Sequence, residues 1–235
     1  MKPVIVTNIR RPDRDLVARI GSYSVATLHE AMGRSGLMLP YMRPIYPDAK
    51  AFGTAVTVLS HPGDNVMIHA SLDVSEPGDL VVVTTTSPST DGMFGELLAT
   101  SMQAHGVTGL IIEAGVRDVA DLTALHFPVW SRAVSAQGTV KATPGSVNVP
   151  VVCAGVMVRP GDIIVADADG VVCVPQERAA EIARLAQQRI EKEEKTRARL
   201  QSGELGLEIY GLRDKLKTMG VTWVSQSEWE GEPCD

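Results

Sequence analysis

The sequence predicts an α/β fold, a single domain with a central mixed sheet followed by a C-terminal helical arm. In the middle of the chain, runs of β-branched residues that predict strands outnumber helical stretches, whereas helical stretches occupy both ends. Of the 235 residues, 44% are hydrophobic and only 4% aromatic, so Val, Ala, Leu and Ile must form the core. Because no linker-like stretch interrupts the elements, we expect an α/β core at residues 1–175 and the arm at residues 176–235.

The first third of the chain predicts helix, loop and strand in that order. Residues 13–34 carry apolar side chains at helical spacing, with Asp13 placed to cap the helix and Gly21 to interrupt it. Three prolines within residues 40–48 indicate a loop. The alternating, β-branched residues 52–59 then predict a strand.

The tripeptide Pro-Gly-Asp, which is typical of turns, occurs three times in the chain. The tripeptide leads into β-type runs in residues 76–85 and 159–175, and it also occurs at residues 62–64 before a different pattern. The intervals are unequal, so the sequence does not indicate a repeat protein. The other elements expected in this region are helices at residues 65–72 and 95–105 and strands at residues 109–113, 127–135 and 147–155.

The C-terminal arm is predicted to be helical. A long helix spans residues 176–201, and a tail helix follows at residues 205–220. Residues 190–201 are almost entirely polar, and a helix that is polar all round either bridges solvent or packs on another subunit. We therefore expect a homo-oligomer in which the arm reaches a neighbouring subunit.

Charge and composition exclude several classes of protein. The formal net charge of −6 argues against a nucleic-acid partner, which would require a basic face. The longest apolar run, residues 149–158, is too short to cross a bilayer, and the N-terminus shows no signal-peptide pattern. Cys153, Cys173 and Cys234 form no disulfide frame or zinc motif, and the first two are expected to be small buried hydrophobic residues. A cytoplasmic protein without a membrane partner is expected.

Common cofactor motifs are missing from the sequence. No GxGxxG, Walker loop or GxSxG pattern occurs. The five histidines form neither HxH nor HExxH spacing. Neither a nucleotide site nor a histidine-zinc site is indicated.

The stretch from residue 95 to residue 118 carries the most chemistry. Glu96 opens a predicted helix, and the strand that follows this helix delivers Arg117 and Asp118 at its end. In open α/β sheets, ligands bind at the carboxyl ends of strands. The two carboxylates are hard oxygen donors suited to Mg²⁺ or Mn²⁺, and the guanidinium can bind a carboxylate or a developing enolate.

The start of the same helix is a second anion-binding feature. The backbone N–H groups of Gly95, Leu97 and Leu98 would point outward and favour an anion. The residues alone leave a structural alternative open: Arg117 and Asp118 would form a surface turn, with Asp118 capping the next helix, and Glu96 would be a solvated first-turn acid. Glu113, inside the same strand, has no role beyond pairing with an arginine.

The chain resembles the class II pyruvate aldolases of the superfamily of the regulator of RNase E activity. The most specific shared signature is an acidic residue, twenty residues and then Arg-Asp, here Glu96 followed by residues 97–116 and Arg117-Asp118. The family often has Asp where this chain has Glu96. Other stretches that carry the resemblance are VATLHEAMGRSGLM, YMRPIYP, PGDNVMIH, DGMFGELLATS, AGVRDVADL, PGDIIVADADGVVCVP and LGLEIYGLRDKL. The resemblance implies a fold of the swivelling β/β/α type.

The resemblance also implies a role for each residue of the signature. Asp118 would anchor a divalent metal, Mg²⁺ or Mn²⁺, largely through waters, and Glu96 would orient a metal-bound water. Arg117 would bind the pyruvate-like oxygen and lower the barrier to its enolate. The backbone N–H groups of Leu97 and Leu98 would hold the pyruvyl carboxylate.

Further residues are implied at the edges of the site. A glutamate from a neighbouring subunit's long helix would complete it, with Glu193 as the best match and Glu194 as the alternative. The residues alone also allow Glu193 to form an ordinary helical ion pair with Arg197. Asn65 and His69 would lie near the distal end of the substrate; their structural alternative is a helix cap and a core histidine.

The activity that follows from the resemblance is a metal-dependent retro-aldol cleavage. The keto-acid 4-carboxy-4-hydroxy-2-oxoadipate would give pyruvate and oxaloacetate, and 4-hydroxy-4-methyl-2-oxoglutarate would give two pyruvates. Such reactions belong to the catabolism of aromatic acids such as protocatechuate, and oxaloacetate decarboxylation would be a side activity. The family also implies a trimer or hexamer with active sites between subunits.

Two other functions are compatible with the sequence. A Schiff-base aldolase would need a buried lysine, and Lys141 is the lysine flanked by apolar neighbours. A non-enzymatic regulator that binds an RNase, as some superfamily members do, would not need the metal-site residues.

Overall fold

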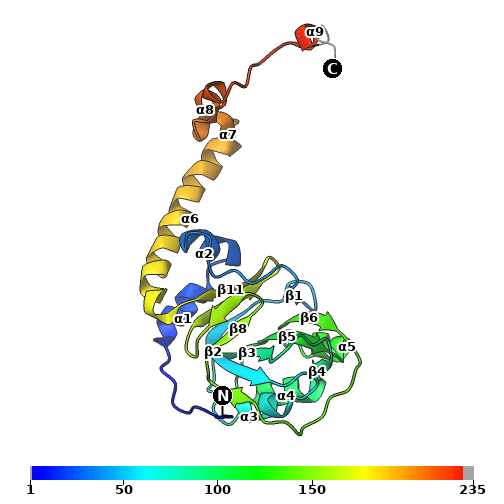
Figure 1. Ribbon diagram of the computed structural model, residues 1–235. Coiled ribbons are helices and arrows are strands. Elements are labelled where there is room, and N and C mark those ends of the chain that lie inside the picture. Colours follow the sequence, from blue (N-terminus) through cyan, green and yellow to red (C-terminus); the bar gives the residue numbers. More distant parts are fainter. Residues whose placement is uncertain (1, 230–235) are drawn as a thin grey trace. The chain divides into compact units, whose positions relative to one another are not determined.

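The computed structural model describes residues 2–229 of the chain. The chain divides into two compact units, Met1–Gln187 and Gln188–Asp235, and each is described by itself. The first unit is a mixed α/β domain, which confirms the predicted fold class (Figure 1).

A mixed sheet forms the centre of the first unit. Along its main path the order of the strands is β1-β6-β5-β3-β2-β10-β11, with β4 paired to β5 and β7 paired to β2. Its central strands β2, β3, β5 and β6 are parallel, while β10, β11 and β1 pair antiparallel. The strands of this sheet are β1 (Arg43–Pro44), β2 (Ala51–Ser60), β3 (Asp79–Thr85), β4 (Gly92–Phe94), β5 (Leu110–Val116), β6 (Val129–Val134), β7 (Ser146–Val147), β10 (Ile163–Asp167) and β11 (Gly170–Val174). A separate hairpin joins β8 (Val151–Cys153) to β9 (Val156–Val158).

Helices connect these strands and cover the sheet. Asp13 caps the first helix as predicted, because its side chain accepts hydrogen bonds from the backbone N–H groups of Asp15 and Leu16. Ser24 caps the second helix through the N–H of Thr27 at 3.1 Å. The helices of the first unit are α1 (Arg14–Gly21), α2 (Val25–Ala31), α3 (Val66–Ser71), α4 (Glu96–Ala104) and α5 (Val119–Ala124), with the 3₁₀ turn η1 (Gln176–Arg178) and the start of α6 (Ala179–Gln201).

The sheet is buried on both faces, which explains its continuous apolar strands. On one face, Leu110 and Ile112 of β5 join a core that includes residues of α3, α4 and α5. On the other face, Ile111 joins a core that includes the β8–β9 hairpin and Trp130. Strand β5 is therefore supported from both sides, and its end is held in place where the polar residues begin.

Several predicted elements differ in the structure. The single strand expected at residues 147–155 is broken, because Asn148 adopts the left-handed conformation (φ 56°) and the chain leaves β7 before it starts β8. The run expected to form one strand at residues 159–175 folds back on itself as the antiparallel pair β10–β11. Short strands β1 and β4 were not predicted, since two or three residues carry no periodicity of their own.

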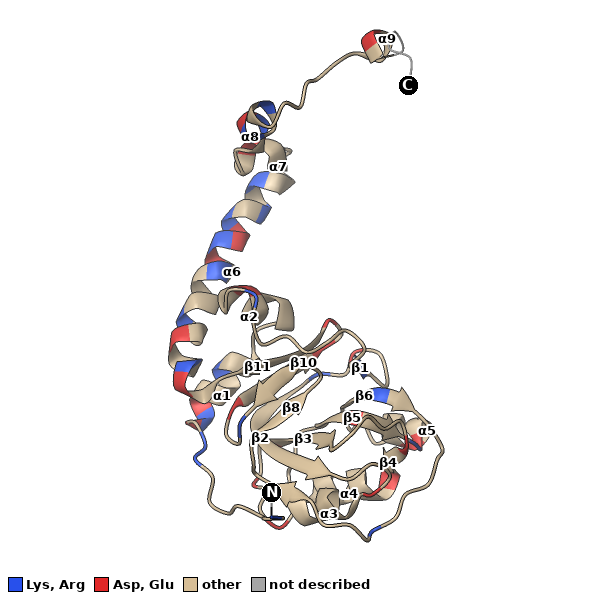
Figure 2. Ribbon diagram, viewed as in Figure 1, with Lys and Arg blue, Asp and Glu red and all other residues tan. Residues whose placement is uncertain are grey.

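The second unit contains the end of α6 and three short helices, α7 (Gly206–Ile209), α8 (Leu212–Thr218) and α9 (Gln226–Trp229). The tail helix expected at residues 205–220 is interrupted because Gly211 takes a left-handed conformation (φ 63°). Charged residues are dense along α6 and α8, whereas they are sparse in the sheet (Figure 2). Between residues 188 and 229 no residue is buried.

Two predictions about cysteines and membranes can be compared with the described residues. Cys153 and Cys173 are free and buried, as expected. Cys234 lies outside the described residues. In the part of the chain that the structure describes, no helix combines the length and the apolar character needed to cross a bilayer.

Candidate functional site

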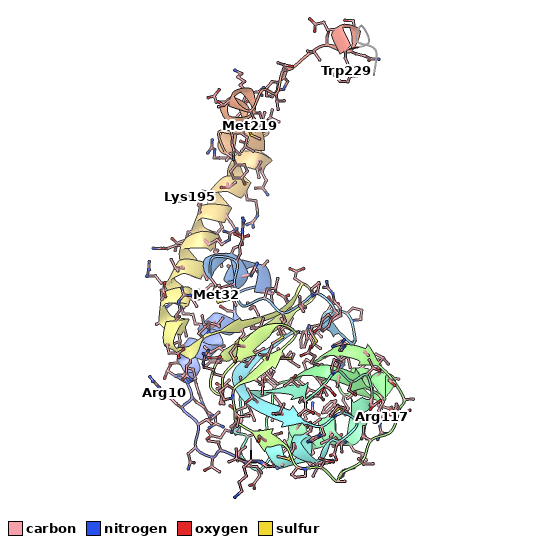
Figure 3. All side chains as sticks on the ribbon, viewed as in Figure 1. Arg10, Met32, Arg117, Lys195, Met219 and Trp229 are labelled. Atoms are coloured by element: carbon pink, nitrogen blue, oxygen red, sulfur yellow. The ribbon has the colours of Figure 1, made fainter. Side chains whose placement is uncertain are left out.

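Two parallel strands bring the signature residues together. Strand β4 runs parallel to β5, with Phe94 opposite Val116, so the residues that follow both strands lie side by side. The backbone N–H of Arg117 donates to the carbonyl of Phe94 at 2.9 Å. The start of α4 and the Arg117-Asp118 pair therefore meet at one edge of the sheet, where ligands of parallel sheets bind. Arg117 is labelled in Figure 3.

Asp118 faces the start of α4 rather than its own helix. Its backbone is left-handed (φ 57°, ψ 38°), and its side chain makes no capping hydrogen bond to α5. Instead, its Oδ2 accepts a hydrogen bond from the backbone N–H of Glu96 at 3.2 Å and lies 3.7 Å from Nε of Arg117. The structural alternative in which this side chain caps α5 is therefore wrong. A carboxylate and a guanidinium, each about two-fifths exposed, are presented together to solvent.

Gly95 is required for this close approach. A Cβ at this position would lie 2.4 Å from Oδ2 of Asp118 and 3.1 Å from Cγ of Arg117. Any side chain would push the carboxylate away from the first turn of α4. The N–H groups of Leu97 and Leu98 lie in that first turn, where an α-helix offers its amides no internal acceptor.

A cleft of about 100 Å³ opens at this edge of the sheet. Seven of the predicted site residues line it: Asn65, His69, Gly95, Leu97, Leu98, Arg117 and Asp118. Its other lining residues are Gly92, Met93, Phe94 and Lys141. A wider hollow of about 370 Å³ shares Arg117 and Asp118 and continues along Val134 and Ala136. Seven of the eight predicted site residues of the core unit thus line one cleft, and Glu96 is the exception.

Asn65 contributes an unpaired acceptor to the cleft. The residue is 6% exposed, and its Nδ2 donates to the carbonyl of Met93 at 3.1 Å. Its Oδ1 is buried and has no hydrogen-bond partner. Asn65 occupies the N-cap position of α3 but makes no side-chain capping bond. A buried acceptor without a donor costs free energy, and a ligand hydroxyl could supply the missing hydrogen bond.

His69 and Lys141 are two further polar residues that line the cleft. Burial and, after it, the positive charge of Lys141 lower the pKa of His69 below its ordinary value. By surface area His69 is exposed, so this desolvation is only partial, and the alternative of a core histidine is wrong. Lys141 is exposed too. The Schiff-base alternative required a buried lysine, and the structure does not provide one at this position.

Lys141 was not predicted as part of this cleft. It reaches the cleft because the backbone around it pairs with the segment before α3: the N–H of Val140 donates to Gly63 at 2.9 Å, and the N–H of Asn65 donates to Val140 at 3.1 Å. These pairings join residues far apart in the chain. No local pattern in the sequence around Lys141 predicts these pairings.

The remaining predicted carboxylates lie outside the small cleft. Glu96 is part of the first turn of α4, and its Oε1 accepts a hydrogen bond from Thr100 at 2.8 Å. Glu193 belongs to the second unit, where it pairs with Arg189 at 2.7 Å rather than with Arg197. Glu194 is exposed in the same unit.

The donor set at the site suits a hard, hydrated cation. Among the described residues no group of three or more His, Cys, Asp and Glu side chains could hold a metal ion. Mg²⁺, however, keeps several waters and commonly uses only one or two protein carboxylates. The exposed carboxylate of Asp118 fits that requirement, whereas zinc would favour His and Cys ligands.

A larger cavity elsewhere in the core unit is a weaker candidate for binding an anionic ligand. It measures about 280 Å³, and its lining mixes apolar residues such as Phe52 with charged residues such as Arg11. The guanidinium of Arg11 already binds the buried carboxylate of Asp79 at 2.7 Å and Glu76 at 3.0 Å. The smaller cleft, with Arg117 and Asp118 exposed to solvent, is the better candidate.

Comparison with known sequences identifies relatives of the chain. A family model described as RraA-like, Aldolase/RraA, matches residues 25–173. A protein of Halalkalibacterium halodurans, provisionally named a 4-hydroxy-4-methyl-2-oxoglutarate aldolase, is 24% identical over 83% of this chain and 93% of its own length. An uncharacterized protein of Methanocaldococcus jannaschii is 33% identical over 78% of this chain and 88% of its own length.

Solved structures share the fold. Streptomyces coelicolor RraAS2, described as an unusual member of the RNase ES inhibitor RraA protein family, superposes with a TM-score of 0.72 at 29% identity. The superposition covers 81% of this chain and 99% of RraAS2. An uncharacterized protein from Pseudomonas syringae gives the same TM-score at 24% identity, covering 84% of this chain and 97% of that protein, and supports the fold alone.

Proposed function

Because the chain belongs to the RraA-like Aldolase/RraA family, we propose that it is a lyase that cleaves hydroxy-keto acids by a retro-aldol reaction. The proposed substrates are 4-carboxy-4-hydroxy-2-oxoadipate, which gives pyruvate and oxaloacetate, and 4-hydroxy-4-methyl-2-oxoglutarate, which gives two pyruvates. Relatives provisionally named 4-hydroxy-4-methyl-2-oxoglutarate aldolase support this assignment.

One observation carries the proposal: Arg117 and Asp118 meet the open N-terminus of α4 at the mouth of a single cleft. The first-turn N–H groups of Leu97 and Leu98 are suited to the carboxylate of a 2-keto acid. Arg117 can then face the C2 oxygen, where negative charge develops as the enolate forms. Two features suited to a pyruvyl group, the first-turn N–H groups and Arg117, thus share one opening.

The reaction takes one proton from the substrate and returns one to it. The C4 hydroxyl loses its proton and becomes the carbonyl of the second product, the C3–C4 bond breaks, and its electron pair forms the C2–C3 double bond while the C2 carbonyl oxygen takes up the negative charge of the pyruvate enolate. A proton then returns to C3 and completes the methyl group. Arg117 stabilises the enolate oxygen, and Glu96, in the first turn of α4, is the carboxylate proposed to orient the water that takes up the hydroxyl proton.

The distal part of the substrate has partners at the other end of the cleft. Oδ1 of Asn65, which lacks a donor, can accept a hydrogen bond from the C4 hydroxyl. His69 and Lys141 can bind the distal carboxylate. These groups would favour acids that carry a second carboxylate beyond the hydroxyl.

A divalent cation, Mg²⁺ or Mn²⁺, would be held chiefly by Asp118 and by water, with Glu96 nearby. Such a cation supplies Lewis-acid polarisation of the 2-keto acid. Oxaloacetate decarboxylation, which passes through the same enolate, is the proposed side activity.

The decisive experiment measures pyruvate release from both hydroxy-keto acids in the presence of Mg²⁺, Mn²⁺ or EDTA. We expect activity with metal and none with EDTA. Replacing Arg117 by Ala should lower kcat by roughly 10²–10³-fold, because one fixed donor at the developing charge is lost. Arg34→Ala, which removes an exposed arginine paired with Glu30 on the surface, is the matched control and should be fully active.

Activity that survives EDTA, together with borohydride trapping of pyruvate on the protein, would reject the metal-dependent mechanism. The likeness to RraA proteins motivates a second candidate, a regulator that binds an RNase. Inhibition of an RNase that is unchanged in Arg117→Ala, without pyruvate release by the native protein, would favour that candidate.

A further inference from the structure

Three Pro-Gly-Asp turns in this chain end in a buried aspartate. Asp64, Asp79 and Asp162 are each 1% exposed. In all three turns the aspartate N–H donates to the carbonyl three residues earlier, so the backbone conformation is shared. The three carboxylates, however, have different partners.

Two of these aspartates close their own turn. Oδ2 of Asp79 accepts from the N–H of Glu76 at 2.7 Å, and Oδ2 of Asp162 accepts from the N–H of Arg159 at 2.8 Å. In each case the acceptor lies three residues after the donor. These two carboxylates therefore stabilise the local turn that leads into a strand.

Asp64 uses its carboxylate differently. Oδ1 accepts from the N–H of Val66 at 2.9 Å, which spans Asn65. Oδ2 accepts from the N–H groups of Ala142 at 2.8 Å and Thr143 at 2.6 Å, and Ala142 directly follows Lys141. One buried carboxylate therefore joins the two backbone segments that carry Asn65 and Lys141, both of which line the cleft.

We propose that Asp64 is a positioning residue. It holds the backbone segments of Asn65 and Lys141 in a fixed relative position, so that both side chains reach the distal part of the substrate together. The inference rests on the proposed function. The three hydrogen bonds outweigh the effect of burial, which would raise the pKa of Asp64, and keep this pKa below its ordinary value. The carboxylate is therefore ionised throughout the neutral range.

The test is Asp64→Asn, which keeps the shape of the side chain. Because the NH₂ group of Asn cannot accept a hydrogen bond, the variant cannot reproduce the bonds at both Oδ1 and Oδ2. KM for the hydroxy-keto acids should rise on the order of tenfold or more, because misplaced binding groups lose substrate affinity. KM for oxaloacetate decarboxylation should change little, since that short substrate needs chiefly Arg117 and the start of α4. Trypsin should also cleave more rapidly after Lys141 in the variant, a readout that does not depend on activity.

Asp162→Asn is the matched control, because it alters a second carboxylate with the same tripeptide and burial outside the cleft. It should leave the ratio of the two KM values unchanged. In the Lys141→Ala background, Asp64→Asn should raise KM less than it does in the native protein, because the part of its effect that acts through Lys141 is already lost. Equal rises in both KM values, or full additivity with Lys141→Ala, would overturn the inference. Absence of aldolase activity in the native protein would instead reject the proposed function.

Discussion

Gly95 allows the carboxylate of Asp118 to approach the first turn of α4 closely. The extended backbone of this residue tolerates any side chain, so the restriction comes from space alone: a Cβ would lie 2.4 Å from Oδ2 of Asp118. We expect Gly95→Ala to move that carboxylate and to lower kcat/KM on the order of 10²-fold, as a small misplacement of catalytic groups can do.

A matched glycine separates this effect from a general loss of stability. A Cβ added at Gly138 would have no described atom within 4 Å, and the backbone there is not left-handed, so Gly138→Ala should be as active as the native protein. Steady-state kinetics of both variants, with circular dichroism to verify folding, test the prediction. A fully active Gly95→Ala variant would show that the contact between Asp118 and α4 is not needed for catalysis.

Glu113 of strand β5 connects several other elements of the core unit. Glu113 accepts hydrogen bonds from Tyr41, from Thr84 at 3.4 Å and from the N–H of Ala154 at 2.8 Å. It also lies 3.6 Å from Nη1 of Arg132, which confirms the expected pairing with an arginine. Glu113 therefore joins β3, β5, β6 and the β8–β9 hairpin on the face of the sheet that packs against that hairpin.

This network predicts a pH dependence of stability. Burial and then the hydrogen bond to Glu113 raise the pKa of Tyr41 from 10.0 to about 12. Because the pKa is higher in the folded protein, the neutral phenol stabilises the fold fully below pH 10, and this contribution is lost as the pH rises from 10 to 12. In Tyr41→Phe the free energy of unfolding should therefore fall less steeply over that window.

Denaturant unfolding of the native protein and of Tyr41→Phe, on both sides of pH 10, measures the difference. Tyr210→Phe is the control, since Tyr210 is 60% exposed. Identical pH profiles for the native protein and Tyr41→Phe would contradict the proposed coupling between Tyr41 and Glu113.

At the level of the complete molecule, the second unit leaves its apolar side chains uncovered. Between residues 188 and 229 no residue is buried, and several large apolar side chains are more than half exposed: Leu205, Tyr210, Met219, Trp223, Val224 and Trp229. Exposed apolar surface of this kind marks an interaction site. It supports the proposal of a homo-oligomer in which Glu193 acts in the site of a neighbouring subunit.

Subunit complementation tests that proposal. Asp118→Asn and Glu193→Gln should each be inactive alone, while co-expressed mixtures should regain part of the activity, because some sites then combine an intact Asp118 with an intact Glu193. Glu194→Gln discriminates between the two candidate glutamates: it should remain active, whereas an inactive Glu194→Gln with an active Glu193→Gln would assign the role to Glu194. Failure of the mixture to regain activity, with mixed oligomers verified by mass spectrometry, would contradict a site shared between subunits.

The sequence allowed much of the fold and part of the cleft to be predicted. Helices and long strands were predicted because apolar side chains recur with a local period. The positions of Glu96, Arg117 and Asp118 at a helix start and a strand end were also predicted locally, but their roles were implied only by the family resemblance, because the residues alone left a surface turn as an alternative. Short strands such as β4 were missed because their pairing partner, β5, supplies the order that their own residues lack.

What the sequence determined alone is the set of chemical groups and the elements that carry them, since both depend on residues close together in the chain. The tertiary structure decided the direction of the Asp118 carboxylate, the unpaired Oδ1 of Asn65 and the presence of Lys141 in the cleft. Each of these depends on contacts between distant segments, such as the pairing of residues 63–65 with Val140. Local periodicity contains no information about such contacts, because they arise only when the sheet assembles.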